Sequence, residues 1–174
     1  DYTYLWSNGQ TTATATGLAA GSYTVTITDD NGCQASAGPV TITEPTQVLA
    51  TMGSPSMVSC NGGSDGSVTV TGSGGTVAGD YTYLWNNGQI TATATGLSAG
   101  SYTVTITDDN GCQASAGPVT ITEPTAVSAS LGLPTMVTCN GDADGSVTVT
   151  GSGGTVAGDY TYLWSNGQTT ATAT

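Results

Sequence analysis

Few side chains of this sequence could take part in chemistry, and the four cysteines are the most reactive of them. They occupy two positions that each occur twice: Cys33 and Cys112 follow Asn-Gly, whereas Cys60 and Cys139 precede it. A thiolate metal site would typically have two cysteines in close C-x-x-C spacing, which is absent here. The pattern therefore favours disulfide bonds formed in an oxidising compartment.

Acidic and amide side chains in the loops near these cysteines form a second group. Carboxylate and amide oxygens are the ligands that Ca²⁺ prefers, six to eight at a time. The candidate calcium ligands are Asp65, Asp108, Asp109, Asn110, Asp142 and Asp144. The same residue types are what turns require, and the full EF-hand loop is missing. Two interpretations stay open, a Ca²⁺ site and plain turn chemistry, and neither makes a cofactor a requirement.

The residue types that are missing exclude several classes of function. The chain has twelve acidic residues and no Lys, Arg or His, which gives a net charge of −12. Without His or Lys, neither a base-activated nucleophile nor a Schiff base is available. Contacts to nucleic-acid phosphates and to anionic membranes need cations. We therefore predict a non-enzymatic, soluble chain with no nucleic-acid partner, no membrane insertion in this segment, and a cation as its natural small partner.

An internal repeat organises the whole chain. Asp1, Asp80 and Asp159 each open the sequence "DYTYLW", so the period is 79 residues, and residues 1–79 differ from 80–158 at twelve positions. Such a period must be settled before any other assignment. We expect a segment of a longer tandem array, in which 1–45 is the C-terminal part of one repeat, 46–124 is a complete repeat and 125–174 is the N-terminal part of the next.

Each repeat has the pattern of an all-β domain. Apolar and polar residues alternate with a period of two, as in half-buried strands, and glycine-rich turns separate these runs. The predicted strands are 47–52, 67–71, 80–85, 91–95, 102–107 and 113–122. Their number and length favour tandem small immunoglobulin-like β-sandwiches, arranged as beads on a string. A solenoid is the alternative, but its repeats usually have 20–50 residues.

The alternation also indicates which side chains form the core. The candidate core consists of Val68, Val70, Tyr83, Trp85, Leu97, Tyr102, Val104, Ile106, Val119 and Ile121. The "GLSAGSY" segment favours a tyrosine corner at Tyr102. Tyr81, Tyr83 and Trp85 could instead stack on carbohydrate, although alternation on one strand favours a core role. The rows of threonine have three interpretations: β-propensity on a solvated face, O-glycosylation, or a flat ligand-binding face.

Two disulfide pairings are compatible with the repeat. Cys60 joins Cys112 within one domain, or Cys33 joins Cys60 across the junction. If the strands simply alternate in direction, the turn before Cys112 returns beside Cys60 and brings the two groups of acidic residues to one end. This argument favours the intradomain bond, which leaves Cys33 and Cys139 to pair outside the sequence. Closing such a loop would stabilise the domain by about 4 kcal/mol in the chain-entropy model.

The motifs occur in the order of a known family. The segments "VSCNGGSDGSVTVTGSGG", "YTYLWNNGQ", "GLSAGSYTVTITDDNGC" and "VTITEP" resemble the SprB repeat of large surface adhesins in gliding Bacteroidetes. One departure is the segment "GGTVAGDYTY", where the family commonly has a shorter loop with proline. The resemblance implies a secreted protein of the bacterial cell surface that acts as an adhesin stalk or filament in attachment or gliding. Its expected partners are other copies of the repeat, and neighbouring filaments or surface glycans. The alternative is a glycan- or Ca²⁺-binding repeat module.

Overall fold

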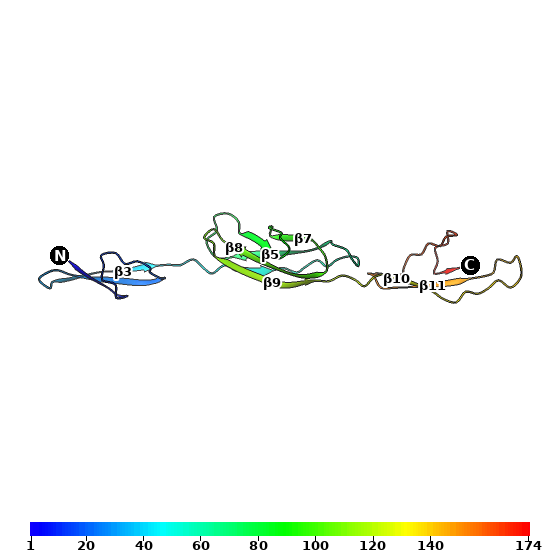
Figure 1. Ribbon diagram of the computed structural model, residues 1–174, viewed down its shortest axis with the longest axis horizontal. Helices are drawn as coiled ribbons and strands as arrows, with labels where there is room; N and C mark the ends of the chain where they lie inside the picture. The colour runs from blue at the N-terminus through cyan, green and yellow to red at the C-terminus, as the bar shows by residue number, and fades with distance from the viewer. The chain divides into compact units, whose positions relative to one another are not determined.

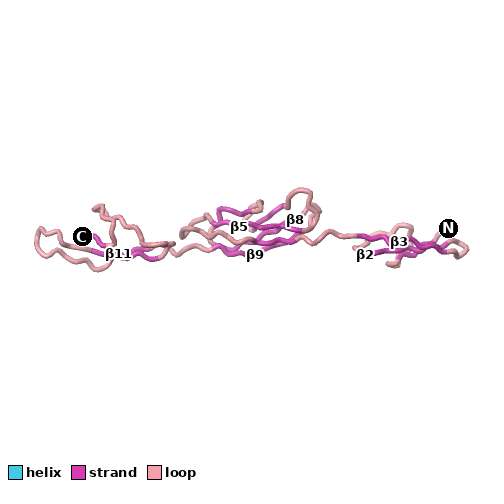
Figure 2. Tube along the Cα trace, turned by 180° about the vertical axis from the view of Figure 1, so that it is seen from behind, coloured by secondary structure: helices cyan, strands magenta, loops and turns pink.

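The computed structural model describes all 174 residues and contains only strands, turns and loops. Its strands form four three-stranded antiparallel sheets (Figures 1 and 2). The predicted all-β class is confirmed, whereas the immunoglobulin-like topology stays a prediction. No helix is present that has the length and apolar character to span a membrane.

The chain divides into two compact units, Asp1–Gln47 with Gly74–Thr76, and Val48–Ser73 with Val77–Thr174. The first unit contains one sheet, of order β1-β2-β3, and the second contains the other three sheets. The strands of the first unit are β1 (Thr3–Trp6), β2 (Gly21–Thr28) and β3 (Gln34–Ile42). The repeat boundaries inferred from the 79-residue period stay predictions.

The second unit holds two sheets from the central repeat and one from the following copy. The central repeat comprises β4 (Leu49–Met52), β5 (Gly66–Ser73), β6 (Thr82–Trp85), β7 (Thr93–Leu97), β8 (Gly100–Thr107) and β9 (Gln113–Ile121). One of its sheets has the order β4-β5-β7 and the other the order β6-β8-β9. The third sheet combines β10 (Ser128–Leu131), β11 (Val147–Ser152) and β12 (Thr172–Ala173).

Alternation along each strand explains how the core of the central repeat forms. Val68 and Val70 on β5 are each 2% exposed, whereas Thr69 between them is exposed and its hydroxyl pairs with that of Thr93 at 2.8 Å. The buried cluster joins both sheets and contains Val48, Val58, Val68, Val70, Trp85, Ala94, Leu97, Val104, Ile106 and Ile121. Tyr83, Tyr102 and Val119 are partly buried against it. Apolar burial of this kind is the main favourable term in folding.

Strand directions give the central repeat two distinct ends. At the end where β4 begins, Leu49 pairs with Ser73 on β5. Thr107 pairs with Gln113 at the same end, because the preceding residue, Ile106, lies against Gly72 of β5. We call this the leading end. At the opposite, trailing end, Gly66 pairs with Leu97 and Gly100 pairs with Ile121. Strands β4, β6, β7 and β9 therefore run from the leading to the trailing end, and β5 and β8 run back.

The crossover from β6 to β7 contradicts the simple alternation of strand direction inferred from the sequence. β6 pairs with β8 in one sheet, whereas β7 pairs with β5 in the other. Both strands run toward the trailing end, because the chain turns after Trp85 and changes sheets instead of forming a hairpin. Every strand after β6 therefore runs opposite to the direction that simple alternation predicts. As a result, the turn after β8 lies at the leading end.

A bulge in the β8–β9 pair depends on a glycine. The register shifts between Tyr102 and Val104, opposite a segment that contains Gly117. Gly117 has φ +106°, and a Cβ at this position would lie 2.7 Å from the Tyr102 carbonyl oxygen. The left-handed backbone and the close approach of two main chains both require the absence of a side chain.

We expect Gly117→Ala to destabilise the central repeat by about 3 kcal/mol, because strain in the backbone and a steric clash add. Gly111→Ala is the matched control: its φ is +84°, but no atom lies within 4 Å of an added Cβ. This control should cost only about 1 kcal/mol. Urea unfolding followed by circular dichroism measures both, and equal losses would contradict the role of the close approach.

Candidate functional site

The loop that holds Cys60 closes the trailing end of the central repeat. Its backbone is tied to the residues after β9: the Val58 amide donates to the Thr122 carbonyl at 3.0 Å. The Gly62 amide donates to Glu123 Oε2 at 2.6 Å, and Asn61 Nδ2 donates to Glu123 Oε1 at 3.2 Å. One carboxylate thus bridges an amide and a side chain from a loop about sixty positions earlier.

A second carboxylate stabilises this loop from within. Asp65 Oδ1 accepts a hydrogen bond from the Ser59 amide at 2.9 Å. The Ser59 hydroxyl, followed by its amide, lowers the pKa of Asp65 below its usual value, because hydrogen bonds to the charged form favour it. In the following copy, Thr138 takes the place of Ser59, and its hydroxyl lowers the pKa of Asp144 in the same way.

The turn that holds Cys112 is built on Asp108 at the leading end. Asp108 is 6% exposed, and its Oδ1 accepts from the amides of Asn110 at 3.0 Å and Cys112 at 2.7 Å. The neighbouring Asp109 accepts from the Ala78 amide at 2.7 Å. This is the local side-chain-to-backbone bonding for which Asp is favoured in turns, and it recurs at Asp29 in the first copy.

The two acidic loops do not come together, so the expectation that they share one end of the domain is wrong. Asp65 lies in the trailing-end loop, and Asp108, Asp109 and Asn110 lie at the leading end, because the chain changes sheets after Trp85. Asp142 and Asp144 both accept from the Thr138 hydroxyl, at 3.1 and 2.7 Å. No three Cys, Asp or Glu side chains approach closely enough in this structure to hold a metal ion.

The cysteines are also separated by the length of the repeat. Cys60 lies by the end of β9 and Cys112 directly before its start, which is a distance of about 30 Å for nine strand residues. A disulfide requires Cα atoms less than about 7 Å apart. All four cysteines, including Cys33 and Cys139, are exposed free thiols in this structure. The strand-direction argument for a Cys60–Cys112 bond is therefore wrong.

The aromatic strand serves the core instead of a surface. Trp85 is 1% exposed, and its indole N–H donates to the Thr91 carbonyl at 2.8 Å, so this ring cannot stack on a carbohydrate. The Tyr102 hydroxyl donates to the Ser98 carbonyl at 3.0 Å, four residues upstream, as in a tyrosine corner. Because the acceptor is a backbone carbonyl, the bond does not depend on the side chain. In the first copy, where Ala19 replaces Ser98, the Ala19 carbonyl accepts in the same way from the Tyr23 hydroxyl.

Glu123 and Asn61 are the functional residues that sequence reasoning missed. A signal was present, since "CNG" and "TEP" each occur at a fixed place in the period. Nothing in the local sequence shows that these segments meet. Neither the trailing-end loop nor the Asp108 turn pairs a nucleophile with a base. Their carboxylates accept hydrogen bonds that close the loops at the two ends of the repeat.

Comparison with known proteins finds a family match for part of two of the repeats. The family model for the SprB repeat matches residues 54–89 and again 134–169, which lie 80 residues apart. The first match runs from the trailing-end loop through β5 and β6 to the turn after Trp85. No curated protein matches the chain.

We expect Glu123→Ala to lower the free energy of unfolding of the central repeat by about 1 kcal/mol, because two donors lose a charged acceptor. Glu44→Ala is the matched control, since Glu44 follows β3 at the equivalent position and lies outside the central repeat. Calorimetry at micromolar protein should show a lower melting temperature for the first variant only. Equal melting of the two variants would mean that the loop closes without Glu123.

The lowered pKa of Asp65 predicts a defined acid dependence. A carboxylate whose pKa is lower in the folded state stabilises the fold above its unfolded pKa of about 3.9, and this contribution disappears as the pH falls through the folded pKa. Asp65→Asn should therefore be less stable than the wild type at pH 6, and the difference should shrink as the pH falls below about 3.9. Urea titrations measure the difference, and Asp80→Asn, an exposed change at the leading end, is the control for the loss of one negative charge.

Proposed function

Two segments of this chain belong to the SprB repeat family, and on that premise we propose that it is a structural, non-enzymatic module of a long extracellular adhesin or surface filament. The family supports the coarser assignment, a repeat module of a surface protein. In the proposal, each repeat adds length and surface for attachment or gliding. Other copies of the repeat in the same chain are its immediate partners.

The direction of the first and last strands of the repeat is the observation that carries this proposal. Both β4 and β9 run from the leading to the trailing end. The polypeptide therefore enters the central repeat at one end and leaves it at the other. The nine residues of β9 alone add about 30 Å of length. A repeat that the polypeptide entered and left at the same end would add far less.

The same geometry determines how the repeat would bear tension. Tension draws the start of β4 toward the leading end and the end of β9 toward the trailing end. The β4–β5 hydrogen bonds are perpendicular to the strands, so the force shears all four residue pairs at once instead of separating them one by one. This loading suits a filament that resists pulling.

Surface chemistry supports the same role. Hydroxyl pairs join neighbouring strands on the solvated faces, for example Thr105 with Ser115 at 3.0 Å and Thr148 with Thr172 at 2.9 Å. Cross-strand pairs of this kind stabilise a sheet without apolar surface. The net charge of −12 makes neighbouring copies repel each other, which favours a soluble, extended chain.

Force spectroscopy on the 174-residue chain tests the proposal. We expect the central repeat to rupture in one step that releases about 220 Å of contour, from 73 residues at the maximal reach of a chain less the folded length. The step should be the same with and without reductant. A step that lengthens greatly in reductant would reveal a Cys60–Cys112 bond and contradict the strand directions.

A proline in β4 separates mechanical strength from general stability. Ala50→Pro should weaken the shear contact and lower the rupture force, because proline cannot take part fully in a ladder. Ala129→Pro, at the equivalent place in β10, should leave the force of the central repeat unchanged. Extension of the wild-type chain without any resolved rupture would contradict a role in resisting tension.

A further inference from the structure

One carboxylate at the trailing end of the central repeat contacts both nitrogen atoms of an Asn-Gly pair. Glu123 Oε2 accepts from the Gly62 amide at 2.6 Å, and Glu123 Oε1 accepts from Asn61 Nδ2 at 3.2 Å. The Pro124 carbonyl also accepts from Asn61 Nδ2, at 3.1 Å. Two acceptors therefore orient the Asn61 side chain with its nitrogen toward Glu123.

An Asn-Gly pair is a dipeptide whose side chain and main chain can react with each other. The nitrogen of the second residue attacks the side-chain carbonyl carbon of Asn and closes a five-membered succinimide ring, with loss of ammonia. Glycine has no side chain that would hinder this approach, and no atom lies within 4 Å of a Cβ added to Gly62. The reaction needs a base for the amide proton and an acid for the leaving nitrogen.

We propose that Asn61-Gly62 is a site of succinimide formation in which Glu123 is the catalytic base and acid. As the Gly62 nitrogen bonds to Asn61 Cγ, its proton passes to Glu123 Oε2, and the side-chain oxygen of Asn61 takes up the electron pair of its C=O bond. Rotation of the carboxyl group then presents this proton to Asn61 Nδ2. The Cγ–Nδ2 bond breaks, the C=O bond forms again and ammonia leaves, which restores the Glu123 carboxylate.

Water completes the modification. It adds to either carbonyl carbon of the ring, and the ring opens to aspartate or isoaspartate at position 61. Asn61, Gly62 and Glu123 are all exposed. Glu123 also lines, with Met57 and Ser59, an open groove with a volume of about 450 Å³. Solvent therefore reaches the ring carbonyls.

Other Asn-Gly pairs of the chain lack a carboxylate at this place. Their glycine amides donate to the backbone carbonyl three residues earlier, at 2.8–3.0 Å. A backbone carbonyl accepts a hydrogen bond but is too weak a base to take up the proton, whereas an ionised carboxylate can be protonated. Five pairs share this arrangement: Asn8-Gly9, Asn31-Gly32, Asn87-Gly88, Asn110-Gly111 and Asn166-Gly167.

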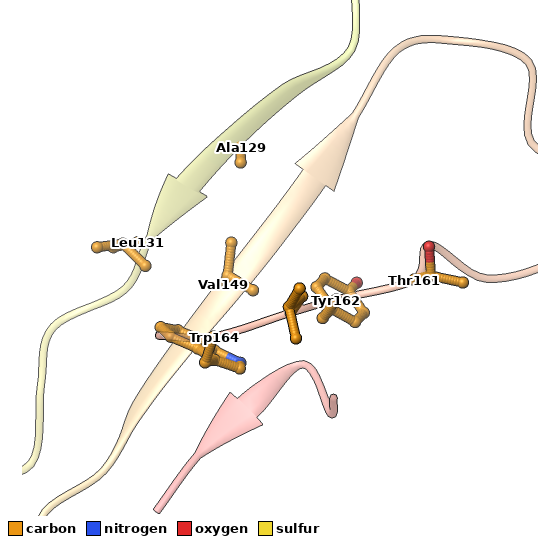
Figure 3. A pocket seen from close by; sticks show the side chains of 7 residues that line it. Ala129, Leu131, Val149, Thr161, Tyr162 and Trp164 are labelled. Carbon is orange, nitrogen blue, oxygen red and sulfur yellow. The ribbon is translucent and has the colours of Figure 1, made fainter. Parts of the chain in front are cut away.

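A cavity beside β10 and β11 shows the contrast with the trailing-end groove. It has a volume of about 280 Å³ and is lined by Ala129, Leu131, Val149 and the segment 161–164. None of the side chains drawn in Figure 3 carries a carboxylate, an amide or a thiol. Such a cavity offers apolar contacts, whereas the trailing-end groove adjoins a nucleophile, an electrophile and a base.

The modification would weaken the loop that contains it. It removes the NH₂ group of Asn61, which donates to Glu123 and Pro124. It also places a new carboxylate beside Glu123, in the loop that holds Asp65. The chain has no Lys, Arg or His to compensate this charge, and like charges at close range disfavour each other. The reaction depends on the fold of the repeat and not on the proposed role in a filament.

Incubation of the 174-residue chain at neutral pH tests the proposal. A protease that cuts after Asp and Glu releases Asn61 in peptide 45–65 and Asn87 in peptide 81–108. Mass spectrometry then follows the loss of ammonia and the later gain of water, and fragment spectra assign both to single residues. In the folded chain, Asn61 should convert about a hundredfold faster than Asn87, the usual contribution of a positioned acid or base.

Unfolding in urea should abolish this difference, because Glu123 reaches Asn61 only in the fold. The two asparagines should then convert at about the same rate. This comparison needs no variant, so it does not depend on whether a variant folds. Conversion of Asn61 that is no faster in the folded chain than in urea would overturn the proposal.

Glu123→Gln separates proton transfer from hydrogen bonding. Glutamine can still accept from the Gly62 amide, but its own amide is too weak a base to take the proton. Conversion of Asn61 should slow about a hundredfold, and that of Asn87 should stay the same. Glu44→Gln, the same change outside the central repeat, is the matched control and should leave both rates unchanged. Unchanged or faster conversion of Asn61 in Glu123→Gln would show that the carboxylate only protects the loop, and would overturn the proposal.

Discussion

Each three-stranded sheet of this protein can bury its apolar face only against the second sheet of the same repeat. The central repeat has both sheets, and Trp85, Val104 and Ile106 are 0–1% exposed there. The same side chains in the partial copies are only half-buried, and the strand register of the first copy is unchanged. Hydrogen bonding within a sheet thus depends on local pairing, whereas the core depends on bringing two sheets together. A chain with so few large apolar residues has no alternative source of comparable stabilisation.

The absence of cationic side chains determines how the acids are used. The side chains and the internal backbone of this chain offer a carboxylate only N–H and hydroxyl donors. Asp108 accepts from two amides of its own turn and Glu123 from the trailing-end loop. These bonds hold the loops at the two ends of the repeat without any ion pair between side chains. The acidic character of the sequence therefore has a structural use in addition to its effect on solubility.

Repetition combines with this architecture to make interchangeable parts. Most differences between the copies lie between Gln47 and Ser64 or at the equivalent positions, in β4 and the trailing-end loop. The inward-facing side chains are nearly unchanged. A filament built from such repeats has equivalent units, since the polypeptide enters each repeat at one end and leaves it at the other.

The sequence by itself determined the period, the all-β class, the positions of most strands and the side chains that face inward. Alternation of apolar and polar residues is a local property of a strand, so Val68, Val70, Val104 and Ile106 could be assigned before any contact was known. The role of Asp and Asn in turns is local for the same reason.

Only the tertiary structure decided which loops lie at the same end of the repeat. Whether the chain forms a hairpin after Trp85 or changes sheets depends on which partner strand gains more buried surface, and no local pattern records that choice. The change of sheets reverses every later strand and separates Cys60 from Cys112 and Asp65 from Asp108. It also brings Glu123 to Asn61, a contact across about sixty residues that follows from the packing of β5 on β9.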